Sequence, residues 1–178
     1  MSKHSNPSLI ISKPKSSNLF YGFSSFESEL RSYSGSDPLS VWHEYIVWVE
    51  QAAGRREGNL KTLLEKCIKE LKDDARYTQD GRFMDVWAKY ANTTDNPGEV
   101  YTFMFKGGIC TARPELYVNW AWALEQAGNA KKAEKVFKQG VQNVGEEHRE
   151  DLKRKHNHFQ VRKRIPLHFI IFIPFMNE

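Results

Sequence analysis

Apolar residues recur at intervals of three and four along most of this chain, the spacing that places them on one face of an α-helix. The clearest stripes are Leu39-Trp42-Tyr45-Ile46-Val49, Leu60-Leu63-Leu64-Cys67-Ile68-Leu71 and Phe83-Trp87-Tyr90-Ala91. No run alternates between apolar and polar residues as a half-buried β-strand does. Turn signals follow one another about every 15 to 20 residues, as pairs of short helices require. We therefore predict an all-α protein of about seven or eight antiparallel helices.

Helix boundaries are marked by capping residues, glycine and proline. Ser36-Asp37-Pro38 predicts a helix start, because Asp is a good N-cap and Pro suits the first helical position. Asp95-Asn96-Pro97-Gly98 predicts a break, and Gly107-Gly108 predicts the end of the short apolar helix that follows it. We also predict a short helix over 23–33 and a charged last helix over 146–163. In the last helix we expect four residues to face inward: Leu152, His156, Phe159 and Val161.

The stretch from Tyr117 to Val141 predicts two amphipathic helices joined by a tight turn at Gly128-Asn129. Its pattern resembles the tetratricopeptide repeat (TPR), in which large and small residues recur at fixed positions. The matching residues are Tyr117, Trp120, Ala121, Leu124, Ala133, Phe137 and Gly140, whereas the usual closing proline is missing. One repeat cannot bury its apolar faces alone, so we predict a TPR-like α-solenoid of about three helical-hairpin repeats with flanking helices. Such arrays mostly bind peptides, which favours a scaffold or adaptor.

The length and charge of the chain are consistent with a single helical-repeat domain. A chain of 178 residues suits one domain, and its net charge is +4. Much of the basic excess lies near the end of the chain, in Lys153, Arg154, Lys155, Arg162, Lys163 and Arg164. Such a cluster could suit nucleic acid, but cations are also favourable at a helix C-terminus. No aromatic residues are interleaved with the cluster, so we favour the interpretation that these cations lie at the C-terminal end of a helix and do not bind nucleic acid.

The two ends of the chain differ in composition from the middle. Residues 1–22 are rich in Ser, Lys, Asn and Pro and predict a flexible leader, with the domain over 23–164. The apolar tail over 165–178 contains IPLHFIIFIPFM, which is much shorter than the roughly 20 residues that span a bilayer. We expect no membrane segment, and we expect this tail to lie outside the folded unit. No secretory signal is present, so an intracellular setting is expected.

Little in the sequence predicts chemistry. We find no Walker A sequence, no Gly-x-Ser-x-Gly and no kinase motif, so we expect no enzyme, no metal and no cofactor. His156 and His158 are two apart and point to different faces of a helix, which is poor metal geometry. Cys67 reads as a small buried hydrophobe, although a disulfide with Cys110 stays open from spacing alone.

Four segments together resemble the N-terminal region shared by the Bub and Mad spindle-assembly-checkpoint proteins. They are DPLSVWHEYIVWVEQ, RFMDVWAKYA, YTFMFKGGICTARPELYVNWAWALEQAGNAKKAEKVFKQGVQ and HFQVRKR. The resemblance covers about Phe26 to Lys163 and includes the step Gly108-Ile109-x-Thr111. The resemblance implies a TPR solenoid in a nuclear protein that localises to the kinetochore in mitosis. It also implies a partner, a short motif of a large Knl-type kinetochore scaffold.

The resemblance also suggests a peptide-binding surface. It implies Trp87, Tyr90 and Thr93 on one helix, with Ala121 and Phe137 on the TPR-like repeat. The leader lacks the Lys-Glu-Asn triplet of the Mad-like branch, which favours the Bub kinase-type branch. Full-length relatives are expected to carry a C-terminal Ser/Thr kinase domain and to bind a WD40 β-propeller checkpoint partner. We favour no nucleic acid as a partner of this chain.

Two further features bear on binding. Trp120 and Trp122 are two apart and cannot both face the core, so one should pack and the other should lie at least partly on the surface. Trp42, Tyr45, Trp48 and Glu50 resemble the layout of half-a-TPR RNA-processing scaffolds, which is our alternative hypothesis. Those scaffolds repeat the motif many times, whereas it occurs about once here.

Overall fold

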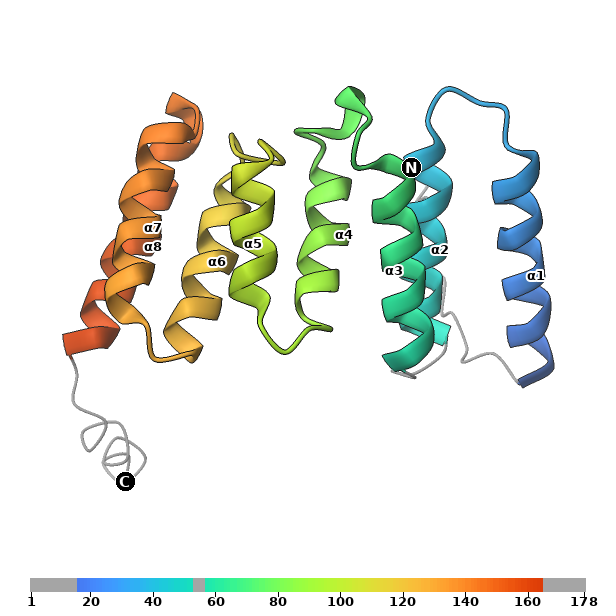
Figure 1. Ribbon diagram of the computed structural model, residues 1–178, viewed down its shortest axis with the longest axis horizontal. Coiled ribbons are helices and arrows are strands. Elements are labelled where there is room, and N and C mark those ends of the chain that lie inside the picture. Colours follow the sequence, from blue (N-terminus) through green and yellow to red (C-terminus); the bar gives the residue numbers. More distant parts are fainter. Residues whose placement is uncertain (1–15, 53–56, 165–178) are drawn as a thin grey trace, which may run out of the picture. The chain divides into compact units, whose positions relative to one another are not determined.

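The computed structural model describes residues 16–52 and 57–164, and within these ranges it contains eight α-helices and no β-strand. The helices are α1 (Ser16–Ser32), α2 (Pro38–Ala52), α3 (Glu57–Leu71), α4 (Gly81–Ala91), α5 (Pro97–Lys106), α6 (Pro114–Gln126), α7 (Ala130–Asn143) and α8 (Glu146–Arg164), and the 3-10 turn η1 (Ala75–Tyr77) precedes α4. The all-α prediction is therefore confirmed (Figure 1). No helix in the described part of the chain combines the length and apolarity needed to cross a membrane. The predicted apolar tail lies outside the described residues.

Contacts divide the chain into two compact units, Met1–Leu60 and Lys61–Glu178. In the first unit α1 packs on α2 through aromatic side chains. Phe26 stacks on Tyr45 with 4.9 Å between ring centroids, and Phe23 meets Trp48 edge-on at 5.1 Å. Trp48 of α2 thus contacts α1 through both Phe23 and Phe26. The helix predicted over 23–33 begins earlier than expected, at Ser16, so it includes residues that we had assigned to the leader.

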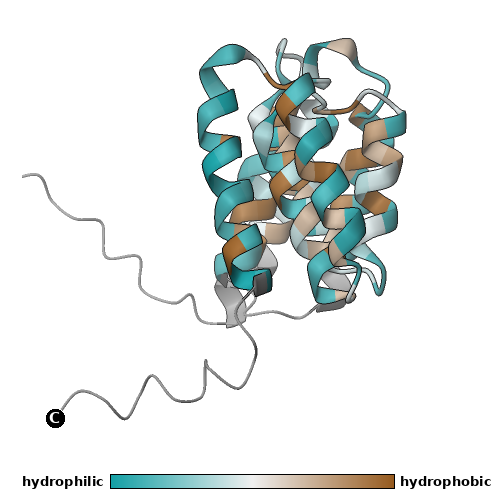
Figure 2. Cartoon of the chain, turned by 90° about the vertical axis from the view of Figure 1, so that its left-hand side faces the viewer, coloured by the Kyte–Doolittle hydropathy of each residue, from teal (hydrophilic) through white to brown (hydrophobic). Residues whose placement is uncertain are grey.

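In the second unit each helix from α4 to α8 packs on the next one in the sequence (Figure 1). Contacts also join α4 with α6, and α6 with α8, which are next-but-one neighbours. This combination is the stacking of helical hairpins that buries a continuous core in repeat proteins. Viewed from the side of α7 and α8, the helices are hydrophilic along much of their length, with hydrophobic residues interspersed (Figure 2).

The α6–α7 hairpin follows the TPR-like pattern closely. Gly128 has a φ of +74°, the left-handed conformation that glycine adopts readily, and it lies between the end of α6 and the start of α7. Gly140 brings α7 so close to its neighbours that an added Cβ atom would lie 2.6 Å from Cγ of Tyr117 and 2.8 Å from Cδ2 of Leu152. The small residue of the repeat pattern therefore permits the close packing of α6, α7 and α8.

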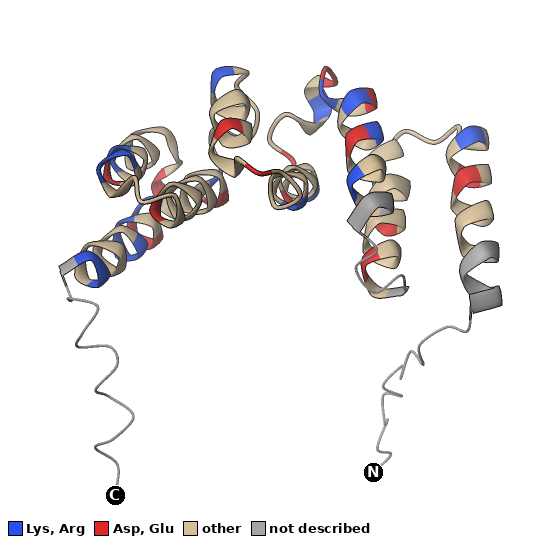
Figure 3. Cartoon of the chain, turned by 60° about the horizontal axis from the view of Figure 1, so that its bottom comes forward, with Lys and Arg blue, Asp and Glu red and all other residues tan. Residues whose placement is uncertain are grey.

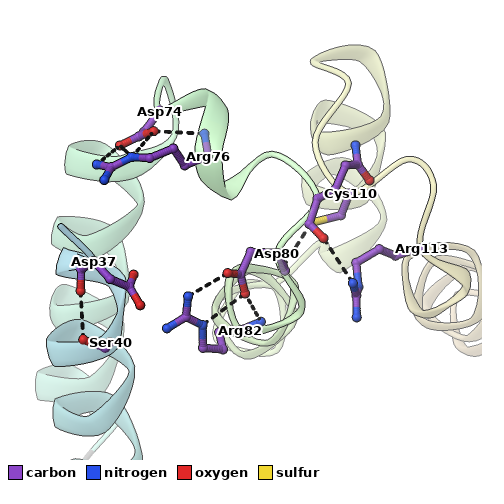
Figure 4. Close-up of polar contacts among 9 residues, drawn as sticks. Asp37, Ser40, Asp74, Arg76, Asp80, Arg82, Cys110 and Arg113 are labelled. Carbon is purple, nitrogen blue, oxygen red and sulfur yellow. Dashed lines mark hydrogen bonds and ion pairs between the residues drawn. The ribbon is translucent and has the colours of Figure 1, made fainter.

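A hydrogen-bonded junction connects the loop before α4 to the loop between α5 and α6 (Figure 4). The backbone N–H of Cys110 donates to the carbonyl of Thr78 at 2.7 Å, and the side chain of Gln79 donates to the carbonyl of Gly108 at 3.2 Å. The guanidinium of Arg113 donates to the carbonyl of Gln79 at 3.1 Å. Gly108 is left-handed, with a φ of +73°. The Gly-Ile-x-Thr step thus has a structural role: it fixes one end of α4 against the start of α6.

Two aspartates cap the elements that lead into this junction (Figure 4). Asp74 accepts from the backbone N–H of Arg76 at 3.0 Å at the start of η1, and Asp80 accepts from that of Arg82 at 2.8 Å at the start of α4. The Arg82 guanidinium also donates to the Asp80 carboxylate at 2.7 Å. Hydrogen bonding from the Arg82 side chain holds the pKa of Asp80 below its usual range.

The last helix packs against α7 through aromatic and polar contacts. Phe137 stacks on His156 with 5.0 Å between centroids and lies 5.4 Å from Phe159. Nε2 of His156 lies 3.0 Å from Oε2 of Glu134. Leu152, His156 and Phe159 face inward as predicted, but Val161 is 57% exposed, so that prediction was wrong. Val161 lies outside because the turn of α8 that carries it presents its other faces to α6 and α7.

Candidate functional site

A cleft of about 530 Å³ lies between α3, α4 and α5, and we call it the α3–α5 cleft. Its volume is typical of pockets that hold the side chains of a ligand. The lining residues are Glu65, Ile68, Lys69, Lys72, Trp87, Tyr90, Glu99, Val100 and Phe103. All of them belong to the second unit.

Three aromatic side chains form the apolar part of the α3–α5 cleft. Trp87 is 3% exposed and lies at its base, whereas Phe103 is 54% exposed. The two rings are 5.8 Å apart between centroids and inclined at 35°. Tyr90 meets Trp87 edge-on at 6.2 Å. Buried Trp87 holds the exposed ring of Phe103 in position and leaves its outer side uncovered. Such a ring can contact an apolar side chain of a partner.

Charged residues of both signs flank these rings. Lys69 and Lys72 lie on α3 or at its end, while Glu65 and Glu99 contribute carboxylates. Nζ of Lys72 also lies 2.6 Å from Oδ2 of Asp73, where both side chains are exposed. An apolar centre with a mixed charged rim is the usual composition of a protein-binding patch.

Of the residues predicted for the peptide surface, the structure brings Trp87 and Tyr90 together in the α3–α5 cleft. The prediction that Thr93 lies on the same helix was wrong, because α4 ends at Ala91 and Thr93 lies in the following turn. There its hydroxyl donates to the carbonyl of Tyr90 at 2.7 Å. Thr93 does not line the cleft, and its hydroxyl closes the end of the helix instead.

Ala121 and Phe137 lie elsewhere in the second unit. Ala121 is fully buried in α6, and Phe137 is 4% exposed in α7, where it contacts α8. Neither lines the α3–α5 cleft. They are packing residues, as their place in the repeat pattern suggests, and the structure does not bring them to the α3–α5 cleft with Trp87.

Sequence reasoning missed the contribution of α3 and α5 to the cleft. Phe103 and Val100 are three apart on α5, and Ile68 lies on the edge of the α3 stripe. A signal was available, because α5 carries more large apolar residues than one buried face can hold. Phe103, Met104 and Phe105 are consecutive, so at least one had to point outward.

Neither a disulfide nor a cluster of potential metal ligands occurs among the described residues. Cys67 and Cys110 are both free and buried, and burial raises the pKa of each thiol to about 12. The disulfide that the sequence left open is therefore not formed. Among the described residues no three His, Cys, Asp or Glu side chains gather as a metal site.

Several basic residues near the end of the chain form ion pairs with acidic residues. Lys153 pairs with Glu150 at 2.7 Å, Lys155 with Asp151 at 2.9 Å, and Arg162 with Glu125 at 2.9 Å. In α8 the acidic residues lie in the first part of the helix and the last part carries only Lys and Arg, as Figure 3 shows. Four of the six basic residues near the end of the chain therefore have an acidic partner within the protein.

The fold defines a class of protein, a TPR-like helical-repeat module, and the α3–α5 cleft lies on its surface. Residues 22–141 match the family described as Mad3/BUB1 homology region 1, and the chain belongs to this family. The family prediction from sequence is therefore confirmed. The match ends at Val141, before α8, and the family covers both branches, so the preference for the kinase-type branch stays a prediction.

Individual relatives agree with this assignment. The human mitotic checkpoint serine/threonine-protein kinase BUB1 beta is 37% identical over 139 residues, which cover 77% of this chain and 13% of that protein. The chain thus spans a small part of the curated relative. The crystal structure of the conserved N-terminal domain of the mitotic checkpoint component BUB1 is similar in fold, with a TM-score of 0.75, 23% identity, and coverage of 83% of this chain and 79% of that chain. A chain in the crystal structure of the mitotic checkpoint complex gives a TM-score of 0.75 and 26% identity, covering 85% of this chain and 79% of that chain.

Proposed function

We propose that this chain is the scaffold-binding module of a spindle-checkpoint protein, and that its α3–α5 cleft receives a short segment of a Knl-type kinetochore scaffold. Through this contact the module holds its checkpoint protein at kinetochores in mitosis. The observation that carries the proposal is the exposed Phe103 ring supported by buried Trp87 inside a cleft. The family membership supplies the class of partner, a protein of the mitotic checkpoint machinery.

The geometry favours a segment with one or two large apolar side chains and charged residues on either side. The apolar side chains cover Phe103 and Tyr90, and the charged ones pair with Lys69 and Glu99 on the rim. A bound aromatic or aliphatic anchor removes the apolar surface of Phe103 from water, which is the main source of affinity at such sites.

Ala121 and Phe137 lie outside the α3–α5 cleft and contribute to this function through the stability of the repeat. Their side chains are buried between α6, α7 and α8, so we propose that they hold the repeat together rather than contact the scaffold. Thr93 acts at the boundary, because its hydrogen bond to the carbonyl of Tyr90 fixes the turn that follows α4. The kinase domain and the WD40 partner implied for full-length relatives belong to the same proposal.

The test compares two aromatic residues that are almost equally exposed. Phe103 lines the cleft and is 54% exposed, whereas Trp122 on α6 is 56% exposed and does not line it. Fluorescently labelled peptides that tile the Knl-type scaffold are titrated against the wild-type chain and against Phe103→Ala and Trp122→Ala variants. Loss of an anchor costs about 2 kcal/mol, so we expect Phe103→Ala to raise the Kd of the binding peptide about 30-fold.

Trp122→Ala should leave the Kd within about threefold of the wild-type value, because surface contacts outside a binding site contribute little. Urea unfolding of both variants checks that neither substitution destabilises the fold. Equal weakening by both variants would show that the α3–α5 cleft is not the binding site. Absence of binding to any scaffold peptide by the wild-type chain would remove the proposed partner.

A further inference from the structure

A second cleft, of about 490 Å³, lies between α5, α6 and α7, and we call it the α5–α7 cleft. Its apolar wall is formed by Trp120, Leu124 and Val136 together with Pro97, Ala123 and Ala127. It lies on the flank of α7 opposite to the one that carries Phe137, which packs on α8. The α5–α7 cleft is thus a second apolar surface that the proposed scaffold site does not use.

One end of the α5–α7 cleft lies at the turn between α6 and α7, where Ala127 and Asn129 line it. The end of α8 lies beside the same turn. Arg162 of α8 donates to Glu125 of α6 at 2.9 Å, two residues before Ala127, and α8 ends at Arg164. The chain therefore leaves α8 close to the mouth of this cleft.

The segment that follows is strongly apolar. From Ile165 to Met176 every residue except His168 is apolar or proline. Such a run in water is an unfavourable exposed apolar surface, and soluble proteins seldom leave one uncovered. Pro166 and Pro174 lack a backbone N–H and disfavour a continuous helix, so an extended path is the expected one.

We propose that residues 165–178 of this chain fold back around the α6–α7 turn and occupy the α5–α7 cleft. The distance is within reach, because an extended segment of this length spans roughly 45 Å and neighbouring helix axes are about 8–10 Å apart. A Cβ added at Gly128, in the α6–α7 turn, would meet no heavy atom within 4 Å, so this turn leaves open space beside it. This proposal replaces our expectation from sequence that the tail lies outside the folded unit.

The occupant is this segment because it is tethered to the mouth of the cleft. Tethering gives a short linked segment an effective concentration in the millimolar range, which a separate partner must exceed. The segment also carries no charge along its apolar run apart from His168, so it can lie between the acidic edge at Asp95 and Glu99 and the basic edge at Lys132 and Lys135 without repulsion.

Disulfide trapping in the full chain tests the proposal. One cysteine replaces Ala127 in the cleft, and a second replaces Leu167, Ile170 or Ile173 in turn. The matched control places the first cysteine at Gln126, which is exposed, adjacent in sequence and absent from the cleft lining. The native Cys67 and Cys110 are buried with raised pKa values, so their thiols react slowly under mild oxidation.

For at least one tail position we expect the Ala127→Cys pair to form an intramolecular disulfide about tenfold faster than the Gln126→Cys pair. When Phe169→Asp and Phe172→Asp are added to both cysteine pairs, the two pairs should form their disulfides at the same rate. Without these two substitutions, equal rates for the two pairs at all three tail positions would overturn the proposal. Disulfide-linked dimers in place of monomers would also overturn it, because a second copy would then fill the cleft.

A second readout does not depend on cysteine chemistry. The methyl groups of Leu124 and Val136 line the cleft, and their NMR signals report its occupant. We expect the methyl signals of Leu124 and Val136 to have different chemical shifts in the wild-type chain and in the Phe169→Asp/Phe172→Asp variant. Unchanged signals would contradict the proposal. The scaffold-peptide titration is distinguishable from both measurements, because it rests on Phe103, which lines the α3–α5 cleft and not the α5–α7 cleft; the two linings share Glu99.

Discussion

Replacing Gly140 by alanine tests the closest helix packing in the structure. The new methyl group would lie 2.6 Å from Cγ and 2.8 Å from Cβ of Tyr117, far inside normal contact distance. Tyr117 cannot easily move away. Its Cβ is attached directly to α6, its hydroxyl donates to the carbonyl of Thr111 at 2.6 Å, and the same hydroxyl accepts from Asn143 at 3.0 Å.

Two effects of opposite sign set the size of the change. Alanine is a better helix former than glycine by about 1 kcal/mol, which stabilises the variant. Overpacking of a close-packed core costs about 1–3 kcal/mol. The net change for Gly140→Ala is therefore a loss of roughly 0–2 kcal/mol in the free energy of unfolding.

A second glycine isolates the packing effect. Gly98 also lies in a helix, α5, but a Cβ added there would meet its nearest atoms at 3.5 and 3.6 Å, which is ordinary contact. Gly98→Ala should therefore be neutral or stabilising by up to about 1 kcal/mol. Since the propensity gain largely cancels between the two variants, we expect Gly140→Ala to be less stable than Gly98→Ala by about 1–3 kcal/mol.

Urea unfolding at 25 °C measures this difference. Circular dichroism and tryptophan fluorescence are followed together, and their transitions should coincide if the second unit unfolds cooperatively. With a urea m-value of about 2 kcal/mol/M, the two midpoints should differ by about 0.5–1.5 M. The reasoning fails if Gly140→Ala proves as stable as Gly98→Ala, because α6 and α7 would then not approach as closely as Gly140 implies.

Two further predictions concern polar contacts in the second unit. Tyr117→Phe removes a fully buried hydroxyl that bridges Thr111 and Asn143, so we expect a loss of about 1–3 kcal/mol in urea unfolding, and a loss below about 0.3 kcal/mol would contradict the bridge. Asp80→Ala removes the N-cap of α4 and its contact with Arg82, at a cost of about 0.5–2 kcal/mol at pH 7. Because the folded pKa of Asp80 lies below its unfolded value of about 3.9, the contact stabilises the protein above that pH and is lost as the pH falls through the folded pKa. The gap between wild type and Asp80→Ala should narrow below about pH 4 in unfolding curves, and a gap that does not change with pH would refute the role of the charge.

The hydrophobic period predicted most of the helices, since it depends only on neighbours along the chain. Asp37-Pro38, Asp95 to Gly98 and Gly128-Asn129 mark helix boundaries in the structure as they do in the sequence. The same local logic separated the two tryptophans of α6, because residues two apart on a helix point in different directions. Trp120 is buried and Trp122 is exposed, as that geometry requires.

The tertiary structure alone decided which helix faces meet. A stripe shows that a residue is buried but not which partner buries it, so Phe137 was assigned to a binding surface although it packs on α8. The apolar run of α5 shows that one of its large residues must point outward, but only the packed structure identifies Phe103 as the exposed one, beside Trp87. The junction of Thr78 and Gln79 with Gly108 and Cys110 has no local signal at all, since its partners lie about 30 residues apart in the chain. Sequence therefore determined the helices and their breaks, whereas the packing of one helix on another created the cleft and chose the residues that line it.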